Sequence, residues 1–450
     1  MTGASAQIAA VDEMAQFAAD LRYAHLPVLV RERLNLMLID LIGVAAAGAR
    51  TPEMRALLDV WGSAPGVSPI VGAHRTTNPE TAAYLNAIAA CSLELDEGNK
   101  HAKGHPAAHV VFSAMAAVQL VERPVTGSEF LTAVAAGYEV AARFGRALER
   151  EATWHTHGHW GVTGAACASA LIMGASRTQI AAAIDASTAL MHVTPWATVL
   201  GGNFVRNLWA AGANMAGLNA ARLALAGLAT NNATALDTLG GIVGSLDTAM
   251  LSHGLGTEWL ITEGYMKRYP SCSYTHAAVD AVQGIKAQQD FCTADIVSVK
   301  VRTHSLAAPL FTRNPHNRLS AMFSLPFVIS AAIVNDALHP PALEPGTRAF
   351  EEAQEFSDKV IVEVSPEFDQ RLPLERWAEV EIVLRDGSVF TDAQPNPIGD
   401  VDYFPMGPAE IEAKLHNLLG SDDGHSIKNT IRHLAESPNA LLTLASLSAI

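Results

Sequence analysis

A short charged segment interrupts an apolar part of this chain, and its residue types could perform acid–base chemistry. The flanking segments, Thr81–Cys91 and Val110–Val121, are apolar and rich in alanine. Burying a charge without a partner is costly, and clustered titratable groups with mutually shifted pKa values mark functional sites. We therefore interpret the segment as part of a site; the alternative is a solvated loop that is rich in charge. Its titratable residues are Glu94, Asp96, Glu97, Lys100, His101, Lys103, His105 and His109.

A second segment, Thr153–Thr163, is rich in histidine and reads TWHTHGHWGVT. His155, His157 and His159 alternate with other residues, so in an extended segment they would lie on one side. Our hypothesis is that at least one of them does acid–base or substrate-binding work, and the alternative is a surface turn. A metal site is the weaker interpretation, because HxHxH lacks a nearby carboxylate at helix spacing. We predict no metal.

A third segment, Met266–His276, reads MKRYPSCSYTH and lies where the sequence changes character. Such a junction between domains favours a small-molecule site. Lys267 there could clamp a carboxylate or, if desolvated, act as a general base. The alternative is a structural turn at the proline.

The fourth candidate is Arg206, the only charged residue within Gly201–Gly217. An arginine in an apolar, alanine-rich helix pairs either with an internal acid or with a substrate carboxylate. The glycines here do not form a G-x-G-x-x-G pattern, so a dinucleotide loop is excluded.

Helices must position these residues over the first half of the chain. From about residue 4 to residue 251, apolar residues recur at spacings of three and four, as in Val28–Leu41 and Phe130–Leu148. Alanines with interspersed glycines, as in Gly217–Ala229, predict helices that approach closely.

The pattern changes after Tyr265. Ile296–Thr303 and Val360–Val364 are predicted strands, and Trp377–Asp392 is predicted as a hairpin around Asp386-Gly387. Helices are predicted over 277–288 and 321–335, and again over 408–419 and 427–447. The sequence thus predicts a mainly α fold, with a discontinuous all-helical domain (1–265 plus 400–450). The α+β lid domain inserted at 266–399 would contain an antiparallel sheet.

Bulk properties exclude several classes of protein. The 450 residues carry a net charge of −15 with no basic cluster, which argues against nucleic acid as a partner. No apolar run reaches the roughly 18–20 residues of a membrane span, and the N-terminus has no basic region typical of a signal peptide. Four scattered cysteines, without a CxxC pair, argue against disulfides and zinc. We expect a cytoplasmic protein that does not bind membranes.

Six segments in the same order resemble the MmgE/PrpD family, which includes 2-methylcitrate dehydratase, cis-aconitate decarboxylase and iminodisuccinate epimerase. The resemblance spans roughly residues 20–330, and one motif, GYEVAARxGRAL, is matched nearly letter for letter. The segments are Leu93–Gly98 with His105-Pro106, Gly137–Leu148, Trp154–Gly161, Val205–Trp209, Lys267–His276 and Ala321–Phe327.

The resemblance implies a helical domain with an inserted α+β lid, a homodimer, and a site between the domains that needs no metal or organic cofactor. It also implies a small polycarboxylate as substrate. The residues that we assign to catalysis are His155, Lys267, His105, Asp96 and Glu94. Those that we assign to substrate binding are Arg206, His157, His101, Lys103, Cys272, Tyr274 and His276.

Several positions depart from the family pattern. Glu94 stands where aspartate is common, and Arg206 stands where lysine is common; an arginine cannot serve as a base at neutral pH. The other departures are His157 and Gly98, each in place of threonine, Met322 in place of lysine and Phe327 in place of tyrosine.

The expected chemistry is removal of a proton next to a carboxylate, with cations stabilising the negative charge that develops. A hydro-lyase similar to 2-methylcitrate dehydratase is the first expectation. An epimerase or a decarboxylase is the alternative, and an inactive carboxylate-binding member of the family is the alternative from another class.

Overall fold

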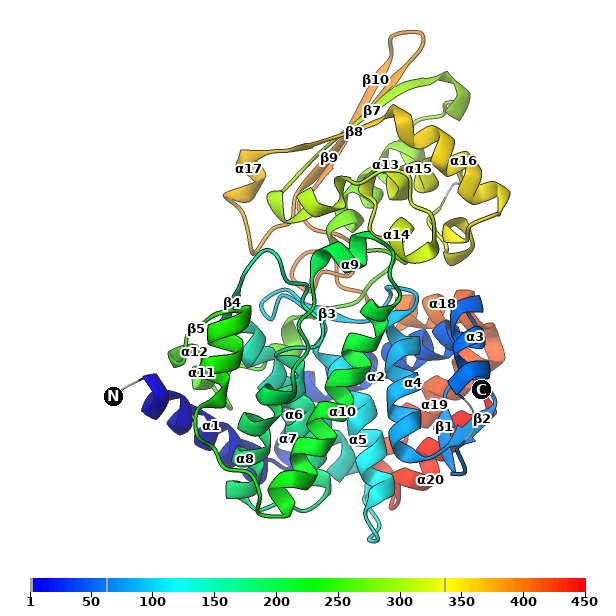
Figure 1. Cartoon of the computed structure of the whole chain (residues 1–450). Helices are drawn as coiled ribbons and strands as arrows, with labels where there is room; N and C mark the ends of the chain where they lie inside the picture. Colours follow the sequence, from blue (N-terminus) through cyan, green and yellow to red (C-terminus); the bar gives the residue numbers. More distant parts are fainter. Residues whose placement is uncertain (1–2, 62–63, 336) are drawn as a thin grey trace.

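The computed structural model describes residues 3–61, 64–335 and 337–450, and it is mainly helical (Figure 1). The first half of the chain forms a body of helices with a continuous apolar core. Its longer helices are α1 (Gly3–Asp20), α2 (Val28–Ala49), α3 (Pro52–Trp61), α4 (Pro79–Cys91), α5 (Pro106–Leu120), α6 (Gly127–Ala147), α7 (Gly161–Ile172), α8 (Arg177–Ser187) and α10 (Val205–Leu225).

Small residues let these helices pack closely, as the sequence predicted. A Cβ added at Gly217 in α10 would lie 2.3 Å from the Cβ of Ala165 in α7. A Cβ at Gly137 in α6 would lie 2.7 Å from the carbonyl oxygen of Gly164 in α7. Both distances are shorter than a packed side chain allows, so glycine is required where α7 meets its two neighbours.

The C-terminal helices pack on the same body. They are α18 (Pro408–Leu419), α19 (Ser421–Arg432) and α20 (Ala440–Ala445), and they lie against α2 and α5 (Figure 1). The sequence predicted α18 with its observed bounds. It predicted one helix over 427–447, whereas α19 begins at Ser421 and Pro438 separates it from α20; a proline removes a backbone donor and ends a helix.

A second apolar core belongs to the α+β region at the upper end of Figure 1. Its sheet has the strand order β10-β9-β7-β8, from β7 (Ile296–Thr303), β8 (Val360–Val364), β9 (Ala378–Leu384) and β10 (Val389–Gln394). The helices α13 (His276–Gln288), α15 (Leu325–Val334) and α16 (Arg348–Phe356) complete the region.

All of the predicted strands are present, but the sheet is not purely antiparallel. β10 and β7 flank β9 in antiparallel pairs, whereas β7 and β8 are parallel. The connection between β7 and β8 contains helices, and such a crossover allows parallel pairing that a short hairpin does not. The helix predicted over 321–335 is divided into α14 (Arg318–Met322) and α15, because Ser324 caps a new helix just before Pro326.

Within the described residues, no single helix is both long and apolar enough to cross a membrane. α2 and α3 together reach that length and composition, but the chain bends by 77° between them.

Candidate active site

At the centre of the site, the carboxylate of Glu94 bridges two cations from distant parts of the chain. Its Oε2 accepts a hydrogen bond from the guanidinium of Arg206, and its Oε1 accepts one from Lys267 Nζ at 2.8 Å. Lys267 Nζ also lies 3.5 Å from Asp96 Oδ1. All four side chains are buried, with no more than 2% exposed. Mutual pairing is what makes their burial tolerable, since an isolated buried ion costs several kcal/mol.

A two-residue strand pair brings Lys267 to the carboxylates. β3 (Gly98–Asn99) follows Glu94 and Asp96, and it pairs with β6 (Gly264–Tyr265), which ends two residues before Lys267. A Cβ at Gly98 would lie 2.4 Å from the outer end of the Tyr265 ring, so a larger residue here would have to displace that ring. Glycine, in place of the hydroxyl-bearing residue of the family pattern, leaves space for the Tyr265 ring.

The backbone of Glu94 is itself unusual, with a φ of 52°. Residues other than glycine rarely adopt this left-handed conformation, and it costs of order 1 kcal/mol. The conformation turns the chain directly after α4 and directs the side chain toward Arg206, at the start of α10.

His105 and Asp96 form a second buried pair beside this cluster. His105 precedes α5, and its Nδ1 lies 2.8 Å from the carbonyl oxygen of Glu97 and 3.3 Å from Asp96 Oδ2. Because a carbonyl can only accept, Nδ1 carries the proton and Nε2 keeps its lone pair. Burial lowers the pKa of His105, so the ring is neutral at neutral pH. Its Nε2 is therefore a base.

Within the cluster, the opposite charges of Asp96 and Lys267 stabilise each other, so both groups stay ionised at neutral pH. Burial raises the pKa of Asp96, but the positive charges of Lys267 and Arg206 outweigh this effect and hold that pKa below its usual value. Burial likewise lowers the pKa of Lys267, yet Asp96 and Glu94 raise it above the ordinary value for lysine. Lys267 is thus a permanent cation at neutral pH and not a base.

The three histidines of 153–163 lie in a buried turn that precedes α7, and not in an extended segment. The ring centroids of His155 and His157 are 4.9 Å apart, and those of His157 and His105 are 4.8 Å apart. His159 instead reaches the carbonyl of His155 at 2.7 Å from its Nε2. Two of the three histidines therefore join the cluster, and the third holds the turn.

Hydrogen bonds also assign the protons of His155 and His157. Nδ1 of His155 accepts from the backbone N–H of His157 at 3.2 Å, which leaves Nε2–H as a donor. Arg206 lies 3.5 Å from Nε2 of His157, so that nitrogen is the acceptor. Burial, followed by the charge of Arg206, lowers both pKa values well below the usual range. Both rings are neutral.

Other predicted residues lie outside this cluster. His101 faces Glu263 at 3.8 Å, and Lys103 pairs with Glu149 at 2.8 Å near the surface. Tyr274 packs against Arg376 and His304. The ring of His276 bonds to the carbonyl of Ser271 at 3.1 Å.

Cys272 is buried, and its backbone N–H donates to the carbonyl of Met322. Burial and the nearby charge of Glu94 raise the pKa of its thiol to about 11. The thiol is therefore protonated at neutral pH, which argues against the thiolate that a cysteine nucleophile requires.

Several residues that surround the cluster were not among the predicted site residues. Trp196 and Trp209 pack against the ring of His155, and the ring of Phe323 lies beneath Arg206. Tyr138 donates to Glu97, and burial raises the pKa of Glu97 to about 8. Glu97 belongs to the charged segment identified from the sequence, whereas the aromatic residues are scattered through the chain, so no local pattern identified them.

Asp96, His105 and His157 have the residue types and the proximity of a metal site, with one potential ligand atom from each within 4.8 Å of the others. Two features oppose a cation there. Lys267 lies 3.5 Å from Asp96, and Arg206 lies 3.5 Å from His157. Both are positive at neutral pH and would repel an ion, so the arrangement suits an anion better.

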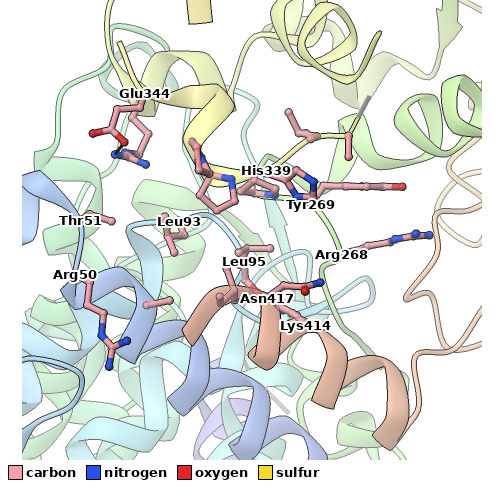
Figure 2. A pocket seen from close by; sticks show the side chains of 18 of the residues that line it. Arg50, Thr51, Leu93, Leu95, Arg268, Tyr269, His339, Glu344, Lys414 and Asn417 are labelled. Carbon is pink, nitrogen blue, oxygen red and sulfur yellow. Dashed lines mark hydrogen bonds and ion pairs between the residues drawn. The ribbon is translucent and has the colours of Figure 1, made fainter. Parts of the chain in front are cut away.

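A cavity of about 1050 Å³ lies beside this cluster, and not within it. Leu93 and Leu95 line it, whereas Glu94 between them faces Lys267 and Arg206. Figure 2 shows this cavity, with Lys414 and Asn417 of α18 close to Leu95.

Fold and site together define a mainly helical protein with a buried cluster of histidines, carboxylates and two cations. The chain matches the MmgE/PrpD N-terminal domain over residues 12–248 and the MmgE/PrpD C-terminal domain over residues 269–436. It therefore belongs to the MmgE/PrpD family.

Curated relatives match nearly the whole chain at low identity. A cis-aconitate decarboxylase of Aspergillus terreus is 22% identical over 98% of this chain and 96% of its own length. A cis-aconitate decarboxylase-like protein, oryM, of Aspergillus oryzae is 23% identical over 97% of this chain and 96% of its own length.

Proposed function

We propose that this protein is a hydro-lyase that removes water from a small polycarboxylic acid without a cofactor. The observation that carries the proposal is the His105–Asp96 pair beside Lys267. A neutral imidazole with its lone pair on Nε2 can abstract a proton next to a carboxylate, and the fixed charge of Lys267 can stabilise the enediolate that results. Membership of the MmgE/PrpD family supports this class of chemistry.

The proton balance favours elimination. His105 takes a proton from carbon and becomes an imidazolium, which Asp96 Oδ2 at 3.3 Å stabilises. The imidazolium then returns the proton to the departing hydroxyl group, which leaves as water while the electron pair forms the double bond. One histidine serves as base and then as acid, and Nε2–H of His155 is a second hydrogen-bond donor for the substrate.

A substrate carboxylate would compete with Glu94. Both oxygens of Glu94 already contact the cations that a substrate would use, Arg206 and Lys267. Nε of Arg206 is buried and has no hydrogen-bond partner among the described residues, so one donor is available before Glu94 moves. We propose Arg206 and Lys267 as the carboxylate ligands, with Glu94 orienting them.

Decarboxylation is the second candidate, and the curated relatives named cis-aconitate decarboxylase favour it. This reaction first releases carbon dioxide and then needs an acid to protonate the carbon. Neutral histidines favour it less, because His105 would have to gain a proton before the reaction.

The spacing of the histidine pairs gives less support to epimerisation. It needs two groups that reach one carbon from opposite faces, each about 3 Å from its proton, or roughly 6 Å apart. The rings of His105 and His157 are 4.8 Å apart, and those of His155 and His157 are 4.9 Å apart. Both centroid separations are shorter than that distance.

Proton NMR in deuterated water tests the proposal. The purified protein is incubated with 2-methylcitrate, citrate, cis-aconitate, malate-type acids and iminodisuccinate stereoisomers. New alkene signals from a hydroxy acid would support the hydro-lyase, whereas loss of a carboxylate from cis-aconitate would replace it with the decarboxylase. Deuterium at an α-carbon with an unchanged skeleton would establish the epimerase.

A matched pair of histidine variants connects any turnover to the cluster. His105→Asn removes the proposed base, whereas His101→Asn changes a histidine of the same segment that faces Glu263. We expect only the first variant to lose turnover. A folded wild-type protein that binds a polycarboxylate but exchanges no deuterium would instead be the inactive carboxylate-binding member of the family.

A further inference from the structure

The cavity of about 1050 Å³ is lined by charged and apolar side chains that take no part in the proposed chemistry. It lies where α2, α3 and α18 of the helical body meet the segments 268–270 and 337–344, which belong to the α+β side (Figure 2). Small-molecule sites have volumes of about 300–1,000 Å³ and favour such junctions. A citrate-sized molecule would fill only a small part of this cavity.

Its charged residues are mainly basic. Arg50, Arg55, Arg268, Arg318 and Lys414 line it, against the acids Glu344 and Glu410. Several of the cations already have partners: Arg50 pairs with Asp423, Arg318 with Glu53 and Glu344, and Lys414 with Asp40.

Two arginines keep most of their hydrogen-bonding capacity. Among the described residues, the guanidinium of Arg55 has no hydrogen bond or ion pair. Arg268 is 48% exposed and reaches Asp280 only at 4.0 Å. Guanidinium groups with free N–H donors at a cavity wall can bind carboxylate, sulfonate or phosphate oxygens.

Much of the remaining lining is apolar and partly flat, and Thr51, Gln283 and Asn417 add polar groups. Leu93 and Leu95 lie at the centre of the view, with the rings of Tyr269 and His339 above them (Figure 2). Pro270, Pro340 and Pro341 add further rigid faces. A ligand that fits this lining has an apolar, flat body as well as a negative group.

The cavity also contacts the backbone that carries the proposed catalytic carboxylates. Lys414 Nζ donates to the carbonyl oxygen of Leu95 at 3.1 Å, between Glu94 and Asp96. On the α+β side, the lining residue Arg268 directly follows Lys267. A molecule in the cavity would therefore touch both segments from the face opposite to Glu94.

We infer that this cavity is a second binding site, which takes an organic anion with a flat apolar body, larger than the small polycarboxylates proposed as substrates. Arg55 and Arg268 hold the anionic group, and the leucine and ring surfaces hold the body. The site is separate from the Glu94 cluster but adjoins its backbone.

Fluorescence titration with anilinonaphthalene sulfonate, an aromatic anion, tests the inference on the intact protein, and calorimetry gives the stoichiometry. We expect one saturable site per chain. Ala413 lines the cavity from an exposed position of α18, so Ala413→Trp should fill the cavity without disturbing the core. We expect it to weaken binding by about tenfold or more, which corresponds to about 1.4 kcal/mol.

A matched arginine pair tests the charge. Arg55→Ala should weaken binding by about threefold, as expected for the loss of one partly solvated ion pair. Arg177→Ala, at the exposed start of α8, should leave binding unchanged. A thermal melt of each variant confirms that it is folded.

Three results would overturn the inference: no saturable binding, wild-type affinity in folded Ala413→Trp, or displacement of the probe by citrate at an equal concentration. Displacement by citrate would mean that the apolar body of the ligand adds nothing to its affinity. Because the titration involves no turnover, its outcome is independent of whether the protein proves to be a hydro-lyase.

Discussion

The Glu94 cluster and the adjoining cavity use similar residue types in opposite ways. In the cluster, Glu94, Asp96, Arg206 and Lys267 are buried, and each ion has an ionic partner within 3.5 Å. In the cavity, Arg55 and Arg268 lie at a solvated wall with few partners. Burial decides how strongly a charge depends on protein partners, because water screens exposed charges but cannot reach buried ones.

The largest expected effect comes from breaking the buried ion network. Lys267→Ala leaves Glu94 and Asp96 buried without their shared cation, so we expect a loss of about 3 kcal/mol or more in the free energy of unfolding. Turnover should fall by about a hundredfold or more. Urea denaturation and the NMR assay measure the two effects. Lys103→Ala, which removes a surface pair, is the control, and an equal loss of stability there would contradict the comparison.

The next effect concerns chemistry more than stability. His105→Asn removes the proposed base, and we expect turnover to fall by about 10²–10⁴-fold. Asparagine can still donate a hydrogen bond toward the carbonyl of Glu97, so the thermal midpoint should change little. Retention of more than a tenth of the activity would remove His105 from the proposed mechanism.

A third prediction concerns pH and the buried acid Glu97. Burial raises the pKa of its carboxyl from 4.5 to about 8 in the folded protein. The folded state therefore binds a proton that the unfolded state has released, and this contribution to stability is complete below about pH 4.5 and is lost as the pH rises toward 8. The expected slope is of order 1 kcal/mol per pH unit.

Glu97→Gln isolates this contribution, because glutamine imitates the protonated acid at every pH. The difference in unfolding free energy between variant and wild type should shift in favour of the variant between about pH 5 and about pH 8. Chemical denaturation across that range measures it. A constant difference would show that Glu97 does not titrate in this range.

The smallest effect is expected in the cavity. Arg55→Ala removes an arginine without an ionic partner among the described residues, so we expect the free energy of unfolding to change by less than about 0.5 kcal/mol. The same urea denaturation measures it, alongside Lys267→Ala. If Arg55→Ala lowered the free energy of unfolding as much as Lys267→Ala, the two regions would not differ in the way proposed.

Local patterns predicted most of the elements. Val360–Val364 and Ile296–Thr303 are strands with the predicted bounds, and a hairpin turns at Asp386-Gly387. These predictions succeeded because alternation and turn chemistry act over a few residues. The pairing of the strands was harder to predict from the sequence. The parallel pairing of β7 with β8 depends on the path of the chain between them, and no local pattern contains that path.

The sequence by itself determined which residues could form the cluster, since Glu94, Asp96, His105, Arg206 and Lys267 were all candidates from residue type and surroundings. Only the tertiary structure decided their roles. Arg206 reaches an internal acid, His105 is held as a neutral base, and His101 faces away from the cluster toward Glu263. The physical reason is that pairing, burial and proton position depend on contacts between residues more than a hundred positions apart, such as Lys267 and Glu94.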